Sequence, residues 1–130
     1  MTAQTWFITG VTSGFGRELT EQLLERGDRV AGTFRRDGGV DDLVTKYGDR
    51  FRPARLDVSD LPAVRSTVGD AFAALGRVDV VVANAGYGLF GAAEEVTDEQ
   101  MTHVITTNLL SSIQTVRATL PHLRAQGGGR

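Results

Sequence analysis

Three glycines lie close together in the stretch TGVTSGFG at residues 9–16, and they are the first feature that could bind a ligand. An apolar stretch at 5–9 precedes them and an amphipathic pattern at 17–26 follows, so they occupy a turn between a strand and a helix. Glycine lets such a turn bend tightly and lets a phosphate approach without meeting a Cβ atom. The free N–H groups and the positive end of the following helix dipole point at the same place. The turn is therefore predicted to bind an anion, most simply the pyrophosphate of a dinucleotide.

Two arginines follow the second predicted strand, where a residue that reads the ribose is expected. This residue should lie roughly 20 residues after the glycines, and an acid there would bind the 2′-hydroxyl of NAD. The sequence instead has Phe34 followed by Arg35 and Arg36. Two guanidinium groups can pair with a 2′-phosphate, and one can also stack on adenine, so NADP is favoured over NAD. The alternative is a basic loop exposed to solvent, and Asp37 could still reach the ribose.

Two polar residues, Asp57 and Asn84, each follow a predicted strand. The carboxyl ends of parallel strands form the edge at which open α/β sheets bind ligands. Both side chains are therefore candidates for the same binding site. The alternatives are a helix N-cap for Asp57 and a simple strand-ending turn for Asn84.

Apolar stretches alternate with helical patterns along the whole chain. This alternation predicts an α/β fold, with a parallel sheet and helices on both of its faces. The strands are predicted at 5–9, 29–34, 51–56 and 78–83, and the helices at 17–26, 40–47, 61–75 and 97–126.

Local signals refine two of these elements. Pro53 suggests an edge position for the third strand, because proline cannot donate to a neighbouring strand. Thr97 and Gln100 form a capping box at the start of the last helix. Pro121 should bend or interrupt that helix.

The composition is that of an ordinary globular protein with one domain. The 130 residues are 41% hydrophobic and 23% charged, with a net charge of −2, so neither nucleic acid nor a membrane is expected as a partner. The absence of cysteine excludes disulfides, thiolate catalysis and zinc–thiolate sites, and no metal site is predicted. No apolar stretch reaches the roughly 18–20 residues of a membrane span, and no signal peptide pattern is present. A cytoplasmic location is therefore expected.

Four motifs, in the right order, resemble those of the short-chain dehydrogenase/reductase family. The stretch at 9–16 matches its Thr-Gly-x-x-x-Gly-x-Gly turn, and Asp57-Val58 looks like its adenine-contacting pair. Asn84-Ala85-Gly86 matches its Asn-Ala-Gly motif after strand four, and Asn108 matches its helix asparagine. The resemblance covers the N-terminal cofactor-binding portion of the family. It implies a partial doubly wound Rossmann fold with strand order 3-2-1-4, and an arginine at position 35 is the family's usual NADP pattern.

The resemblance also implies a reaction and roles for residues. The reaction is reversible hydride transfer between a nicotinamide and an alcohol or ketone, with the hydride supplied by the cofactor. Asn108 is the one member of the catalytic set that can be placed, and in the family this position holds a water that connects to the catalytic lysine. The predicted cofactor-binding residues are Gly10, Ser13, Gly14, Phe15 and Gly16 in the turn, Arg35 and Arg36, Asp57 and Val58 at the adenine, and Asn84, Ala85 and Gly86 near the nicotinamide-side ribose.

The family's catalytic serine and Tyr-x-x-x-Lys pair have no counterpart in this sequence. Tyr47 and Tyr87 are followed four residues later by Phe51 and Gly91, and Lys46 is the only lysine. In the family, the lysine lowers the pKa of the tyrosine, whose phenol exchanges a proton with the substrate oxygen. The chain is interpreted as an NAD(P)-binding domain truncated before strand five and the catalytic segment, and it is predicted to be inactive alone. The alternative is a non-catalytic dinucleotide-binding or regulatory module.

Two surfaces are expected to be left uncovered in such a chain. The strand at 78–83 would become an exposed apolar edge. The helix at 97–126 often contributes to subunit contacts in the family, so a homo-oligomer is expected. His103 and His122 lack a partner pattern and are interpreted as surface or interface residues.

Overall fold

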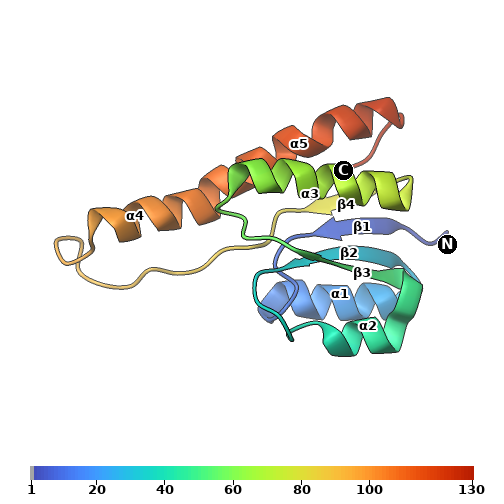
Figure 1. The fold of residues 1–130 in the computed structure, drawn as a ribbon, viewed down its shortest axis with the longest axis horizontal. Coiled ribbons are helices and arrows are strands. Elements are labelled where there is room, and N and C mark those ends of the chain that lie inside the picture. Colours follow the sequence, from blue (N-terminus) through green and yellow to red (C-terminus); the bar gives the residue numbers. More distant parts are fainter. Residues whose placement is uncertain (1) are drawn as a thin grey trace.

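The structure, a computed structural model, describes residues 2–130 as a four-stranded parallel sheet flanked by helices (Figure 1). The strand order β3-β2-β1-β4 confirms the predicted order 3-2-1-4. The strands are β1 Thr5–Ile8, β2 Arg29–Phe34, β3 Phe51–Arg55 and β4 Val80–Val82. The helices are α1 Gly14–Arg26, α2 Asp41–Tyr47, α3 Leu61–Leu75, α4 Asp98–Ile105 and α5 Ser111–Ala125, with a 3₁₀ turn at Gly48–Arg50 and a π-helical segment at Thr106–Leu110.

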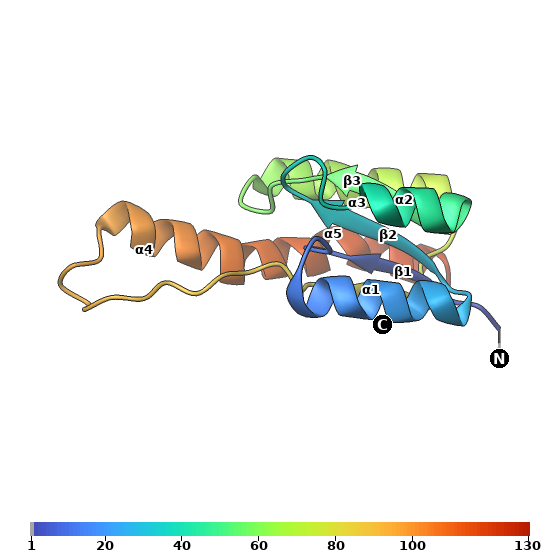
Figure 2. The ribbon, with the colours of Figure 1, turned by 90° about the horizontal axis from the view of Figure 1, so that it is seen from below.

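Helices cover both faces of the sheet, with α1 and α2 on one face and α3 and α5 on the other (Figure 1). Adjacent residues of β1 face opposite sides because side chains alternate along a strand. Phe7 packs in the core with Val68 of α3, whereas Ile8 packs with Leu24 of α1 and Leu43 of α2. Figure 2 shows that α4 and the loop before it extend beyond the end of the sheet.

The two edge strands behave differently. Pro53 lies in β3, which is an edge strand as predicted, and it is aligned with Gly32 of β2. The strand predicted at 78–83 is shorter in the structure, where it forms β4. The backbone of one residue forms hydrogen bonds along its outer edge. Arg130 donates its N–H to the Asp79 carbonyl at 2.9 Å and accepts from the Val81 N–H at 2.8 Å. The outer edge of β4 is therefore paired over one residue.

The predicted helix at 97–126 forms α4, the π-helical segment and α5 in direct succession. Its capping box is confirmed, since Thr97 Oγ1 accepts from the Gln100 N–H at 3.1 Å and Gln100 Oε1 accepts from the Thr97 N–H at 3.0 Å. The change to π geometry was not predicted. Hydroxyl groups in this region donate to the carbonyl four residues earlier, as Thr106 does to Thr102 at 2.9 Å, and such bonds favour local bending of a helix.

Pro121 lies inside α5, and the helix continues through it, so of the two predicted effects, a bend or an interruption, the interruption does not occur. A proline removes one backbone hydrogen bond, but the turn that follows it still packs on α3. There His122 stacks on Phe72 with ring centroids 4.5 Å apart. No helix among residues 2–130 combines the length and the apolar surface that crossing a bilayer requires.

Candidate cofactor-binding site

A cleft of about 690 Å³ lies at the carboxyl edge of the sheet, where segments that follow all four strands meet. Most of the residues predicted to bind a cofactor line this cleft. Gly16, Arg36 and Asn108 are the predicted site residues that do not line it. Those that do are Gly10, Ser13, Gly14, Phe15, Arg35, Asp57, Val58, Asn84, Ala85 and Gly86.

The turn between β1 and α1 leaves open space in front of the helix. Gly10 and Gly14 have φ angles of +73° and +61°, which residues other than glycine rarely adopt. Ser13 is the N-cap of α1, but its side chain makes no capping hydrogen bond. A Cβ atom on Gly14 would have no atom within 4 Å, and Phe15 is 90% exposed. The N-terminal N–H groups of α1 are therefore accessible to an anion.

Asn84 locks this turn against the end of β4. Its Nδ2 donates to the carbonyls of Thr9 and Gly10, each at 3.1 Å. In return, Thr9 Oγ1 accepts from the N–H groups of Asn84 and Ala85, each at 3.0 Å. A Cβ atom on Gly16 would lie 2.0 Å from the Gly10 carbonyl oxygen. The side chain of Asn84 and the absence of one at Gly16 thus fix the shape of the turn.

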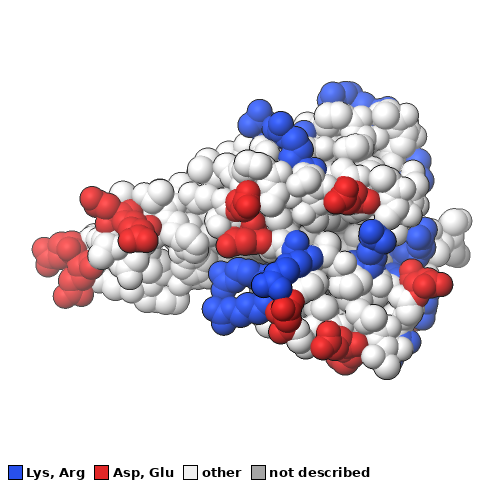
Figure 3. All heavy atoms as spheres, in the orientation of Figure 1, with Lys and Arg blue, Asp and Glu red and all other residues white. Residues whose placement is uncertain are grey.

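The loop that follows β2 is basic on the side of the cleft. Arg35 lines the cleft, and among residues 2–130 neither Arg35 nor Arg36 forms an ion pair within 4.0 Å. Asp37, the carboxylate that could have competed for a ribose, is held by Arg55, whose Nη1 lies 2.8 Å from both carboxylate oxygens. Figure 3 shows basic side chains gathered on this face beside smaller acidic groups. The loop can therefore offer positive charge to a ligand.

Asp57 faces the cleft and is not the N-cap of α3. That cap is Asp60, whose Oδ1 accepts from the Ala63 N–H at 3.1 Å. Asp57 Oδ1 instead accepts from the hydroxyl and the N–H of Ser59, at 2.7 and 3.0 Å. These bonds, aided by the nearby charge of Arg35, hold the pKa of Asp57 below its ordinary value. Asp57 is therefore a stable carboxylate, able to accept a hydrogen bond.

Asn108 lies behind the cleft wall. Its Oδ1 accepts from the Tyr87 N–H at 2.9 Å, and its Nδ2 donates to the Tyr87 carbonyl at 2.7 Å. The π-helical segment carries Asn108 at its centre, facing the chain that leaves β4. Asn108 thus shapes the lining formed by Gly86 and Tyr87.

Sequence reasoning did not select seven of the residues that line the cleft, and Tyr87, His103 and Thr107 are among them. His103 is exposed, as its interpretation as a surface residue requires, but its Nδ1 lies 2.7 Å from the Tyr87 hydroxyl, a partner that the sequence pattern did not indicate. The Thr107 hydroxyl is buried and has no hydrogen-bond partner among residues 2–130. Two signals could have identified these residues. Tyr87 directly follows the Asn-Ala-Gly motif, and His103 and Thr107 are four residues apart, so they lie on the same face of a helix.

Known proteins match this chain over nearly all of its length. A family model described as short chain dehydrogenase matches residues 4–130. The oxidoreductase BOA17 of Botryotinia fuckeliana is 37% identical over 125 residues, which is 95% of this chain and 46% of that protein. A solved short-chain dehydrogenase from Streptomyces avermitilis has a TM-score of 0.93 and 40% identity, over 98% of this chain and 47% of that one.

A further solved structure, ElxO with NADP bound, has a TM-score of 0.88 and 25% identity. The match covers 98% of this chain and 53% of ElxO. The chain spans about half the length of the curated relatives that it matches.

Proposed function

The chain belongs to the short-chain dehydrogenase family, and we propose that it forms the cofactor-binding part of an NADP(H)-dependent oxidoreductase. The proposed reaction is hydride transfer between the nicotinamide and an alcohol or ketone, with the hydride supplied by the bound cofactor. One observation carries the choice of NADP: Arg35 lines the cleft without an ion-pair partner among residues 2–130, while Asp37 is held by Arg55. The binding of NADP by the similar ElxO supports the same choice.

The cleft fits a dinucleotide in two respects. Open space in front of Gly14 lies where a pyrophosphate would meet the α1 N–H groups. The buried Thr107 hydroxyl lacks a partner among residues 2–130 and lines the same cleft, and a ligand could satisfy it. We assign Gly10, Ser13, Gly14, Phe15 and Gly16 to the pyrophosphate, Arg35 and Arg36 to the 2′-phosphate, Asp57 and Val58 to the adenine, and Asn84, Ala85 and Gly86 to the nicotinamide-side ribose.

The chain is proposed to lack the residues that exchange a proton with the substrate. Neither Tyr47 nor Tyr87 is followed by a lysine four residues later, so no phenol here has the neighbour that the family's chemistry needs. Asn108 remains the proposed catalytic position. Each end of its side-chain amide makes one hydrogen bond to Tyr87, and its backbone carbonyl accepts from the Ser112 hydroxyl at 3.1 Å.

Self-association is proposed through the helix that runs from α4 to α5. This helix exposes large apolar side chains along its length, and burial in a subunit interface would remove them from water. They are Met101, Ile105, Leu109, Ile113, Val116 and Leu120.

The cofactor proposal is tested by titrating the full chain with NADPH and NADH. NADPH should bind more tightly, and Arg35→Ala should weaken NADPH by roughly tenfold or more, because a charge-assisted phosphate contact is lost. Arg65→Ala removes an exposed arginine that does not line the cleft, and it should change neither affinity. Equal affinities for the two cofactors, or no loss in Arg35→Ala, would contradict the proposal.

A further inference from the structure

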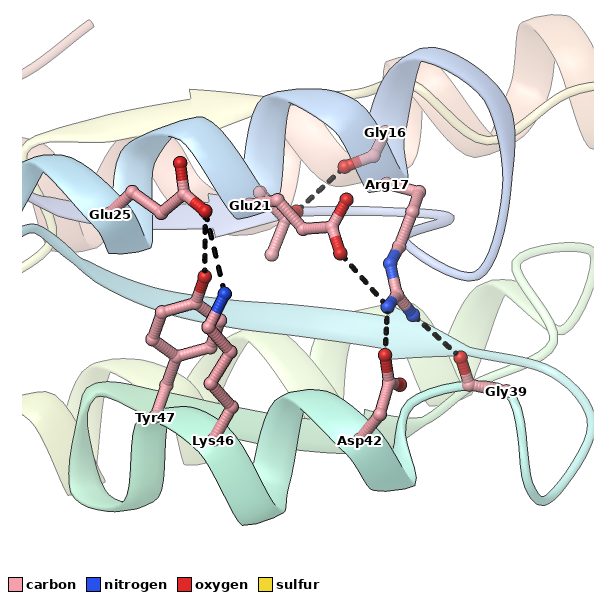
Figure 4. Close-up of polar contacts among 9 residues, drawn as sticks. Gly16, Arg17, Glu21, Glu25, Gly39, Asp42, Lys46 and Tyr47 are labelled. Carbon is pink, nitrogen blue, oxygen red and sulfur yellow. Dashed lines mark hydrogen bonds and ion pairs between the residues drawn. The ribbon is translucent and has the colours of Figure 1, made fainter.

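The guanidinium group of Arg17 joins α1 to the loop residue Gly39 and to the first turn of α2 (Figure 4). Its Nη1 donates to the Gly39 carbonyl at 3.0 Å. Its Nη2 binds Glu21 at 3.0 Å and also contacts Asp42 in the first turn of α2. The Arg17 side chain is only 20% exposed, whereas its partner Asp42 is 67% exposed, so a partly buried guanidinium group binds a carboxylate at the surface.

Gly39 belongs to the loop at 35–40, which carries the arginines proposed to bind the 2′-phosphate. The same residue packs on the glycine turn, since a Cβ atom on Gly39 would lie 2.8 Å from Thr12 Cγ2. Gly38 precedes it with a φ of +90°, and two adjacent glycines make an unanchored loop entropically costly to order. Arg17 and Thr12 together hold the loop against the turn.

Arg17 itself does not line the cleft, and its positive charge is already paired with two carboxylates. Glu21 and Asp42 together more than balance one guanidinium group. The hydrogen bond to Asp42 raises the pKa of Arg17, and the same bond lowers the pKa of Asp42, so both groups stay ionised. A cation in the first turn of a helix also opposes the helix dipole. The position of Arg17 is thus explained by what it holds in place.

We propose that Arg17 is a positioning residue for cofactor selection: by fixing Gly39, it holds the 35–40 loop in the conformation that presents Arg35 to a 2′-phosphate. This inference rests on the proposed NADP function. A loop ordered before binding loses less entropy when the ligand arrives. Because NADPH carries the 2′-phosphate and NADH does not, the ordered loop should raise the affinity for NADPH and hardly change the affinity for NADH.

The test is titration of the full chain and its variants with NADPH and with NADH. Arg17→Met keeps the aliphatic stem and removes every donor, and it should weaken NADPH by about three- to tenfold while changing NADH by less than about twofold. Lys46→Met is the matched control. It removes one positive charge and the 3.4 Å contact to Glu25 at the far end of the same α1–α2 interface (Figure 4). This control should leave both affinities within about twofold.

Two further variants separate the possible outcomes. Asp42→Asn removes one anchor of Arg17 and should show a smaller loss of the same selective kind, which keeps the test valid if Arg17→Met does not fold. Equal weakening of NADPH and NADH in the folded variants, or no weakening of either, would overturn the positioning role. If Arg35→Ala still weakens NADPH in those experiments, only this inference fails. If Arg35→Ala also has no effect, the NADP assignment itself fails.

Discussion

The side chain of Asn108 holds the backbone of Tyr87 at both of its polar groups, accepting from its N–H at 2.9 Å and donating to its carbonyl at 2.7 Å. The preceding residue, Gly86, lies so close that a Cβ atom on it would be 3.0 Å from Asn108 Oδ1. This pairing fixes the path of the chain as it leaves β4 and enters the cleft wall. It also couples the cleft to the π-helical segment that carries Asn108.

Replacing Asn108 should release this part of the wall. Asn108→Ala leaves the Tyr87 N–H and carbonyl without partners, and we expect the free energy of unfolding to fall by about 1–2 kcal/mol. Hydrogen exchange at the Tyr87 amide should also become faster. Urea unfolding measures the first effect, and amide hydrogen exchange measures the second. The control is Ser112→Ala, which removes the 3.1 Å bond from the Ser112 hydroxyl to the Asn108 carbonyl but leaves the Asn108 side chain in place, and it should cost less than about 0.5 kcal/mol. An equally protected Tyr87 amide in Asn108→Ala would contradict the clamp.

Two glycines of the turn should respond differently to the same added methyl group. In Gly16→Ala the new Cβ would lie 2.0 Å from the Gly10 carbonyl oxygen and 2.4 Å from Asn84 Nδ2. We expect a loss of about 3 kcal/mol or more in stability, because backbone cannot move aside easily. In Gly14→Ala the Cβ meets nothing, so the fold should survive at a cost of about 1–2 kcal/mol from the positive φ.

Gly14→Ala should also weaken dinucleotide binding, although it leaves the fold intact. The methyl group of Gly14→Ala would stand where we place the pyrophosphate, so NADPH affinity should fall sharply in a chain that still unfolds cooperatively. Thermal unfolding and NADPH titration of the same samples measure both effects. Unchanged NADPH affinity in Gly14→Ala would show that this turn holds no phosphate.

Much of the fold could be predicted because local signals and the order of elements agree. Contiguous apolar stretches alternated with helical patterns, and this alternation alone implies a parallel sheet with helices on both faces. Pro53 marked the edge strand, and Thr97 with Gln100 marked the start of the long helix. Those signals act within a few residues of the element that they define, so they can be read without the tertiary structure.

The features that could not be predicted depend on contacts between distant segments. The bond between Tyr87 and His103 joins a loop to α4 across 16 residues, and no short motif encodes it. The pairing of Asp37 with Arg55 decides which charges of the basic loop remain available, yet it requires the end of β3 to lie beside that loop. The π geometry around Asn108 likewise departs from helical spacing that the sequence pattern otherwise satisfies.

Acid should remove part of the stability through Asp28, which is only 2% exposed. Burial alone would raise its pKa, but hydrogen bonds from the Gln4 N–H at 2.9 Å, from Arg26 and from Trp6 lower the pKa below its ordinary value. The folded chain therefore binds this proton less readily than the unfolded chain. The resulting stability is present above the unfolded pKa near 4 and is lost as the pH falls through the lower folded pKa.

Asp28→Asn tests this dependence. At pH 7 the variant should be less stable by about 1–3 kcal/mol, because a charged hydrogen-bond acceptor in a buried position is lost. The difference from the natural sequence should narrow as the pH falls below about 4, because the unfolded chain takes up the Asp28 proton first and the folded carboxylate does so only at its lower pKa. Urea unfolding of both chains at pH 7 and at acidic pH measures this difference in the free energy of unfolding. A difference that is independent of pH would mean that the charge of Asp28 contributes nothing.

The exposed apolar face of the long helix should control the association state. Leu109 is 55% exposed in the π-helical segment, and Leu109→Asp would place a charge inside an interface formed by this face, where desolvation opposes it. We expect sedimentation to show self-association of the natural chain and a dissociation constant raised by about tenfold or more in the variant. Val44→Asp is the matched control, because Val44 is a 40% exposed apolar residue of α2, on the opposite face of the sheet. Equal dissociation by both variants would show that added charge, and not the loss of this particular face, separates the subunits.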